Sequence, residues 1–152
     1  MASPFGFPPV CIHMQKSTGY ISPINKLKAK IRARKKAYGI VQPDAGMCGI
    51  TEAMKIAHMA HRYGVDLCPH SWHNGLMAMA NAHLVAALPN PRVLELCRIQ
   101  GPLQWGILAE KPLIRDGWLE LPDRPGLGVQ LAGGVDERFP YIEGHYAIEV
   151  RR

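Results

Sequence analysis

The chain has 152 residues, of which 47% are hydrophobic, and this length favours a single domain with a sizeable core. No uninterrupted apolar run approaches the ~18–20 residues of a membrane helix, so no membrane span is expected. The formal net charge is +6, but residues 1–40 carry eight Lys or Arg and no Asp or Glu, and the rest has a net charge of −2. The basic character therefore belongs to one segment and says little about the partners of the remainder.

Residues 1–37 are predicted to form a basic arm that is disordered or loosely attached. The first 23 residues are rich in Pro, Gly and Ser, and the apolar start lacks the basic region of a signal peptide. Lys26–Lys36 could form a basic helix, but it lacks an apolar stripe wide enough to pack. The four cysteines, at positions 11, 48, 68 and 97, form no C-x-x-C pair, which favours reduced thiols and a cytoplasmic location.

After residue 37 the pattern alternates between short strands and helices. The predicted elements are a strand end at 38–42, a loop at 43–46, a helix at 52–63 capped by Thr51, a strand at 65–68, a helix from the Asn74 cap to Leu88, and a strand at 93–97. This order predicts neighbouring parallel strands joined by right-handed crossovers.

The later part of the chain has a different pattern. Asp116-Gly117 lies between two short apolar segments, residues 113–115 and 118–120, which predicts a β-hairpin. A Pro- and Gly-rich loop follows, and residues 145–150 are predicted to be extended. We expect residues 38–131 to form the folded segment and residues 132–152 a C-terminal tail.

Three ionisable side chains recur at the interval of one strand-plus-helix unit. Asp44 follows the first predicted strand, His70 follows the second, and Glu95 lies near the end of the third, at spacings of 26 and 25 residues. Parallel strands carry their active sites at their C-terminal ends, so these side chains are expected to converge there.

Each of the three residues also has a purely structural interpretation. Asp44 could stabilise a turn, His70 could be a loop histidine, and Glu95 could bridge to a nearby Arg or Lys. A carboxylate within the apolar run of Glu95 is costly unless it is paired or protonated, and functional sites tolerate such costs. An Asp–His pair can take up and return a proton, and a protonated carboxyl group can donate to an enolate oxygen.

These residues lie in segments that resemble a known family. The segments 41–46 and 49–57 resemble the sixth-strand region of the enolase superfamily, mandelate racemase/muconate lactonizing enzyme family, and 69–71 and 94–95 resemble its seventh and eighth strand ends. The segment 123–129 resembles its closing segment. The resemblance covers residues 39–131 and implies an α/β fold: a partial (β/α)8 TIM-type barrel of the last three βα units, followed by a hairpin and a return segment.

The resemblance implies a role for each of these side chains. His70 would be the acid/base, Asp44 its orienting partner, and Glu95 the donor to an enediolate oxygen. Trp72, His73 and Asn74 lie beside His70 and could contact the substrate, although loop packing and helix capping also explain them. The implied reaction is proton abstraction α to a carboxylate, in a dehydratase of acid sugars or a racemase of hydroxy acids.

The sequence also departs from the family pattern. Family enzymes carry a capping domain, a Lys base on the second strand and three carboxylate ligands for Mg²⁺ on later strands, and none of these can be placed here. The usual Gly-Gly before the sixth helix is reduced to Gly49. We therefore expect a truncated segment that is inactive alone, contains no metal ligands and does not bind the family's Mg²⁺ by itself.

Two alternatives belong to other functional classes. Seven of the eleven residues in Lys26–Lys36 are basic, which suits nucleic-acid phosphates, but the segment has no aromatic residue for stacking, so nucleic acid is not the favoured partner. His58 and His61, like His70 and His73, are three residues apart, as in some metallohydrolases. No carboxylate near them in the sequence completes a ligand set, so surface histidines are the favoured interpretation. A three-strand segment exposes a sheet edge, which self-association as a homo-oligomer would cover.

Overall fold

The computed structural model describes residues 10–14, 39–89, 92–97 and 101–143. The basic run Lys26–Lys36 and the predicted extended tail at 145–150 lie outside the described residues. No helix in the described part of the chain has the length and apolar character needed to cross a membrane.

From β2 to α5, helices follow each of the described strands, as expected for an α/β fold. In chain order they are β1 (Val10–Met14), β2 (Ile40–Val41), α2 (Ala45–Cys48), α3 (Ile50–Arg62), β3 (Asp66–Leu67), α4 (Gly75–Ala86), β4 (Leu94–Leu96), α5 (Pro102–Trp105), β5 (Ile114–Arg115), β6 (Trp118–Leu119) and α6 (Val135–Arg138).

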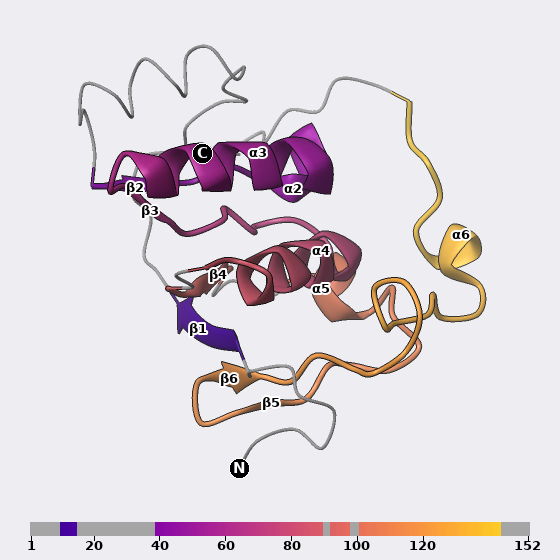
Figure 1. Ribbon diagram of the computed structural model, residues 1–152. Helices are drawn as coiled ribbons and strands as arrows, with labels where there is room; N and C mark the ends of the chain where they lie inside the picture. Colours follow the sequence, from indigo (N-terminus) through magenta and orange to yellow (C-terminus); the bar gives the residue numbers. More distant parts are fainter. Residues whose placement is uncertain (1–9, 15–38, 90–91, 98–100, 144–152) are drawn as a thin grey trace, which may run out of the picture.

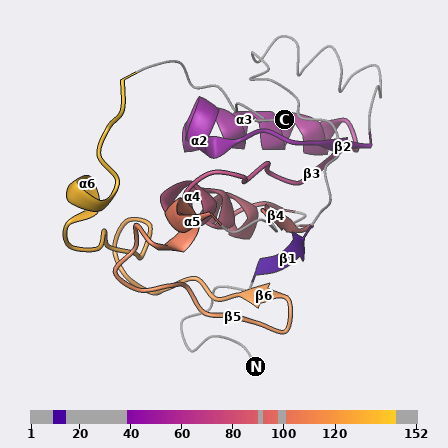
Figure 2. The same ribbon diagram turned by 180° about the vertical axis from the view of Figure 1, so that it is seen from behind.

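The elements form layers, which Figures 1 and 2 show from opposite sides. Helix α3 covers the β2–β3 pair, and α4 lies between that layer and a second sheet that contains β4, β1 and the β5–β6 hairpin. Helix α4 contacts α2, α3 and β4, so it is the central element of the molecule.

The first sheet confirms the predicted parallel pairing. Strands β2 and β3 are parallel, with Ile40 opposite Asp66 and Val41 opposite Leu67. The expectation that the third predicted strand continues this sheet is wrong, because β4 belongs to the second sheet, whose order is β4-β1-β6-β5.

Strand β1 is a second departure, because it lies within the segment predicted to be a loosely attached arm. It pairs in parallel with β4, from Ile12 opposite Leu94 to Met14 opposite Leu96, and antiparallel with β6. The physical reason is the burial of β4, all three of whose residues are buried. Buried backbone N–H and C=O groups need hydrogen-bond partners, and a neighbouring strand supplies them.

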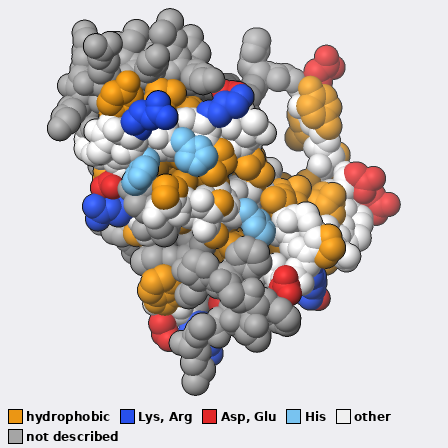
Figure 3. All heavy atoms as spheres, viewed as in Figure 1, with side chains coloured by type: hydrophobic (Ala, Val, Ile, Leu, Met, Phe, Trp, Pro, Cys, Tyr) orange, Lys and Arg blue, Asp and Glu red, His pale blue; other side chains and the backbone are white. Residues whose placement is uncertain are grey.

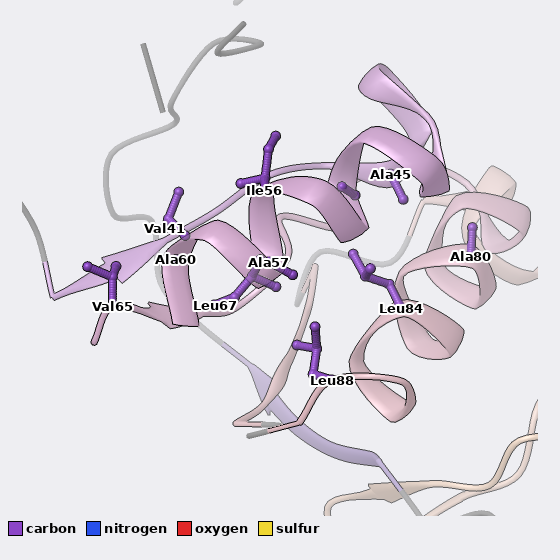
Figure 4. Close-up of a cluster of buried hydrophobic side chains, with 11 residues drawn as sticks. Val41, Ala45, Ile56, Ala57, Ala60, Val65, Leu67, Ala80, Leu84 and Leu88 are labelled. Carbon is purple, nitrogen blue, oxygen red and sulfur yellow. The ribbon is translucent and has the colours of Figure 1, made fainter. Parts of the chain in front are cut away.

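The core consists of two clusters on opposite sides of α4. The first lies between α3, the β2–β3 pair and α4, as Figure 4 shows, and includes Ile56, Leu67 and Leu84. The second lies between α4, β4 and the hairpin, and includes Met79, Leu96 and Leu119. Because α4 is apolar on both sides, it contributes to both clusters.

Local sequence signals account for most element boundaries. Asn74 caps α4 as predicted, accepting a hydrogen bond from the Met77 N–H. The hairpin forms around Asp116 (φ 52°) and Gly117 (φ 79°), as its turn sequence predicts. Two boundaries differ: residues 45–48 form the short helix α2 instead of a loop, and α3 begins at Ile50 after Gly49, so Thr51 is not its cap.

Several large hydrophobic side chains are exposed on this segment. Figure 3 shows hydrophobic side chains as orange patches on one face of the molecule. The largest exposed apolar side chains are Ile40, Met47, Ile50, Trp72, Leu103, Leu113, Trp118, Leu131, Tyr141 and Ile142. Exposed apolar surface of this kind is common where a protein contacts further chain or a partner.

Candidate functional site

The candidate site lies where the chain leaves β2, β3 and β4. The loops after β2 and β3 are held together by a backbone hydrogen bond of 3.0 Å from the His70 N–H to the Pro43 carbonyl. The three side chains singled out in the sequence, Asp44, His70 and Glu95, all belong to this region.

His70 and Glu95 are in direct contact. The His70 Nδ1 and Glu95 Oε2 lie 2.9 Å apart, and their side chains are 15% and 2% exposed. The sequence left open an Arg or Lys partner for Glu95, and the structure gives it a histidine. A carboxylate oxygen at this distance fixes the rotation of the imidazole ring and distinguishes its two nitrogens, because Nδ1 is the one that contacts Glu95.

Asp44 lies next to this pair, and one of its two carboxylate oxygens is held by hydrogen bonds. It is the N-cap of α2: its Oδ1 accepts a hydrogen bond of 2.8 Å from the Gly46 N–H and one of 3.3 Å from the Asn81 side-chain amide. The residue is only 7% exposed. The sequence predicted Asp44 as the partner that orients His70, whereas the 2.9 Å hydrogen bond of the His70 ring goes to Glu95.

Asn81 is a site residue that the sequence analysis missed. It is fully buried in α4, and its Oδ1 accepts a hydrogen bond of 2.9 Å from the Ala45 N–H. Its amide donates to the His70 carbonyl at 3.0 Å as well as to Asp44. One side chain therefore ties the loop after β2 to the loop after β3. The available signal was an amide in the middle of an otherwise apolar helix, because buried polar groups are nearly always hydrogen-bonded.

His73 lies close to Asp44, a contact that the sequence analysis did not predict. Its Nε2 is 2.8 Å from the Asp44 Oδ2, and the His73 side chain is 18% exposed. The contact lacks the angles of a hydrogen bond, so both atoms are buried without a hydrogen-bond partner. One nitrogen of His70, one of His73 and an oxygen of Asp44 all lie within 4.8 Å of one another.

The other two residues proposed for substrate contact differ in their surroundings. The Trp72 ring lies 5.5 Å from the His70 ring, centroid to centroid, and the residue is exposed. Asn74 uses its side-chain oxygen to cap α4. The helix-capping interpretation of Asn74 thus has a contact to support it, and Trp72 remains a candidate for substrate contact.

A buried thiol, Cys68, and a partly buried one, Cys48, lie beside the site. Burial, followed by the negative charge of Glu95, raises the pKa of the Cys68 thiol to about 11. Burial, followed by the charge of Asp44, raises the pKa of the Cys48 thiol. Both thiols are therefore kept protonated, which argues against a nucleophilic role.

Comparison with known proteins gives a consistent family. A family model described as "Enolase C-terminal domain-like" matches residues 28–135. The chain is 40% identical over 107 residues to arabinonate dehydratase from Saccharolobus solfataricus. It resembles the solved mandelate racemase/muconate lactonizing enzyme from Sulfitobacter sp. (30% identity, TM-score 0.68) and a protein from Burkholderia xenovorans bound to magnesium and fumarate (28% identity, TM-score 0.65).

The chain corresponds to only a part of each of these proteins. The matches cover 70%, 79% and 70% of this chain, in the order given above. They cover 28% of the arabinonate dehydratase and 30% and 27% of the two solved chains.

Proposed function

Because the chain belongs to the enolase C-terminal domain-like family, of the mandelate racemase/muconate lactonizing enzyme type, we propose that it is the acid/base segment of an acid-sugar dehydratase or hydroxy-acid racemase. In this proposal residues 38–131 are the last three βα units of a (β/α)8 barrel with its hairpin and return segment. The segment is inactive alone, because the remaining units would supply the other half of the site.

The observation that carries the proposal is the meeting of His70 and Glu95 beside Asp44. These residues come from three loops or strands far apart in the sequence, yet the His70 and Glu95 side chains lie 2.9 Å apart and a ring nitrogen of His70 lies within 4.8 Å of an Asp44 oxygen. A structural role alone would not require three ionisable groups in one largely buried place, where each is costly.

In the proposed reaction His70 moves the proton. Its Nδ1–H donates to Glu95, so the lone pair of Nε2 can take the proton from the carbon α to the substrate carboxylate. The electron pair of the broken C–H bond then forms the enediolate. In a racemase an acid from the remaining units of the barrel returns a proton to the other face of that carbon, while His70 keeps the proton that it took up. In a dehydratase the β C–O bond breaks, and the His70 proton leaves with the hydroxyl group as water.

Glu95 can serve both the histidine and the substrate. Its Oε2 accepts the hydrogen bond from His70. When its other oxygen carries a proton, the same carboxyl group can donate to the enediolate oxygen, where charge develops in the transition state. Asp44 adds negative charge near the imidazolium that forms when His70 takes up the proton.

The residues described here do not suit Mg²⁺. The group of side chains that could hold an ion in the described part of the chain combines one carboxylate with two imidazoles. Mg²⁺ requires oxygen ligands, whereas imidazole suits transition metals. Any Mg²⁺ of the complete enzyme is therefore proposed to be held by other parts of the barrel, and no step above is assigned to it.

Partners and location follow from the same proposal. The proposed substrate is a small acid sugar or hydroxy acid, in line with the arabinonate dehydratase match. The exposed apolar side chains would contact the rest of a barrel or a second copy of the chain. The thiols of Cys48 and Cys68 fit a reducing cytoplasm.

The proposal is tested with a chimera. The segment of the arabinonate dehydratase that matches this chain is replaced by the corresponding residues of this chain, and Mg²⁺-dependent turnover is measured with a panel of acid sugars. We expect the chimera to convert an acid sugar to a 2-keto-3-deoxy acid, and the isolated 152-residue chain to convert none.

A matched variant separates catalysis from folding. His70→Asn in the chimera should reduce kcat by about 10²–10⁴-fold, the usual contribution of general acid–base catalysis, while the thermal midpoint is retained. A folded chimera with no activity, full activity of His70→Asn, or robust turnover by the isolated chain would each contradict the proposal.

A further inference from the structure

Three side chains of the site could also bind a metal ion, which the proposed proton transfer does not require. Asp44, His70 and His73 each offer one ligand atom, and these atoms lie within 4.8 Å of one another. One carboxylate oxygen with two imidazole nitrogens is the donor set that proteins use for divalent transition metals such as zinc and non-haem iron.

Two of these atoms lack any hydrogen-bond partner. The Asp44 Oδ2 and the His73 Nε2 are both buried, and the Asp44 side chain is only 6% exposed. A buried polar atom without a hydrogen bond is costly, and these two atoms have only each other, as an ion pair when His73 is protonated. The Asp44 Oδ2 and the His73 Nε2 lie 2.8 Å apart, but the angles between them are not those of a hydrogen bond. A cation between them would satisfy both.

The surrounding contacts orient the ligands as a metal site requires. The Asp44 Oδ1 is occupied by the Gly46 N–H and the Asn81 amide, which directs Oδ2 toward the histidines. The His70 Nδ1 is bonded to the Glu95 carboxylate at 2.9 Å. Metal-binding histidines commonly donate their second ring nitrogen to a carboxylate in this way, which leaves the first nitrogen unprotonated for the metal.

We propose that Asp44, His70 and His73 form a site for a divalent transition-metal ion of the Zn²⁺ or Co²⁺ class. Ligand atoms of a tetrahedral zinc, each ~2.0–2.1 Å from the ion, lie about 3.3 Å apart. The distance between the Asp44 and His73 ligand atoms is 2.8 Å, which is below that value. No two of the three ligand atoms lie more than 4.8 Å apart, so the remaining distances can include it. The His70 and His73 side chains are 15% and 18% exposed, whereas the Asp44 and His73 ligand atoms are buried, so the proposed ion lies beneath the surface.

This site goes beyond the proposed acid/base function and does not depend on it. A metal ion on His70 would occupy the nitrogen that the proton-transfer role needs. The same residues can therefore hold a transition metal or move a proton, but not both at once. In the active chimera, Zn²⁺ should inhibit turnover in competition with protons.

The test is titration of the metal-free 152-residue chain with Co²⁺ and Zn²⁺. We expect one Co²⁺ per chain, with the strong visible bands of four- or five-coordinate cobalt, and displacement of that Co²⁺ by one Zn²⁺. Asp44→Asn keeps the helix cap, because Asn caps as well as Asp, and removes the charged ligand. Asp44→Asn and His73→Gln should each weaken binding by at least about 10–100-fold.

The control removes the exposed histidines of α3. His58 and His61 are exposed on one helix and three residues apart, so they could bind metal weakly by themselves. The double variant His58→Ala/His61→Ala should retain full affinity and the same visible spectrum. Loss of binding in this control, unchanged binding in His73→Gln, or only weak six-coordinate cobalt with the unmodified chain would overturn the proposal. The chimera assay, run in Mg²⁺ with zinc removed, reports on the acid/base function independently of this result.

Discussion

The buried amide of Asn81 should contribute a large share of the stability that holds the two site loops together. It makes three hydrogen bonds: it accepts from the Ala45 N–H at 2.9 Å and donates to the His70 carbonyl at 3.0 Å and to the Asp44 carboxylate at 3.3 Å. Replacing Asn81 by Leu, which is similar in size, removes all three.

The expected cost follows from what the Leu would leave unsatisfied. Asp44 keeps its bond to the Gly46 N–H, so the main losses are the partners of the Ala45 N–H and the His70 carbonyl. Each buried polar group left without a partner costs about 1–3 kcal/mol, so Asn81→Leu should lower the free energy of unfolding by about 2–6 kcal/mol.

Urea denaturation of the whole chain measures this cost. Asn74→Ala is the matched control, because it removes an Asn side chain that makes one capping hydrogen bond and should cost about 0.5–2 kcal/mol. A cost for Asn81→Leu no greater than that of Asn74→Ala would refute the reasoning. So would an Asn81→Leu variant that is more stable than the parent chain.

Three further predictions concern the core and the thiol beside the site. Gly75→Ala should strongly destabilise the chain in thermal denaturation, because the added Cβ would overlap a backbone oxygen of α5, while Gly101→Ala, with open space around it, should change stability by less than about 0.5 kcal/mol. Leu84→Ala should cost about 2–5 kcal/mol in urea denaturation, because Leu84 is 1% exposed, and Leu131→Ala, at 56% exposed, should be nearly neutral. Because burial raises the pKa of Cys68 to about 11, the folded chain holds this proton more tightly than the unfolded chain. The stability that this protonated thiol contributes should therefore be complete below the ordinary thiol pKa of 9.0 and be lost as the pH rises toward 11. The rate at which Cys68 is alkylated should rise over the same pH range. Rapid alkylation of Cys68 at neutral pH would contradict this prediction.

The features that the sequence predicted best are those set by residues close together in the chain, such as turns and helix caps. The hairpin follows from Asp116-Gly117, whose positive φ angles suit the tight turn, and the start of α4 follows from the Asn74 cap. His70 and Glu95 meet as the spacing led us to expect, but not for the expected reason, because β3 and β4 lie in different sheets.

Contacts between distant segments were not predictable in the same way. Strand β1 lies in a segment without periodicity, and it is a strand because it pairs with β4 and β6. The sequence offered no rule to pair His73 with Asp44, or Asn81 with both loops, because these contacts depend on how α4 packs beneath them. Both missed contacts bear on the proposals: Asn81 positions Asp44, and His73 completes the candidate metal site.

The ring proton of His70 provides the most direct check on the arrangement at the centre of both proposals. A long-range ¹⁵N–¹H NMR spectrum of the metal-free, ¹⁵N-labelled 152-residue chain distinguishes which imidazole nitrogen carries it. If Glu95 holds the ring, His70 will have its proton on Nδ1, and Glu95→Ala will shift it to the Nε2–H form that is usual for free histidine. A His70 signal of the Nε2–H form in the unmodified chain, unchanged by Glu95→Ala, would contradict the proposed hydrogen bond from the His70 Nδ1–H to Glu95.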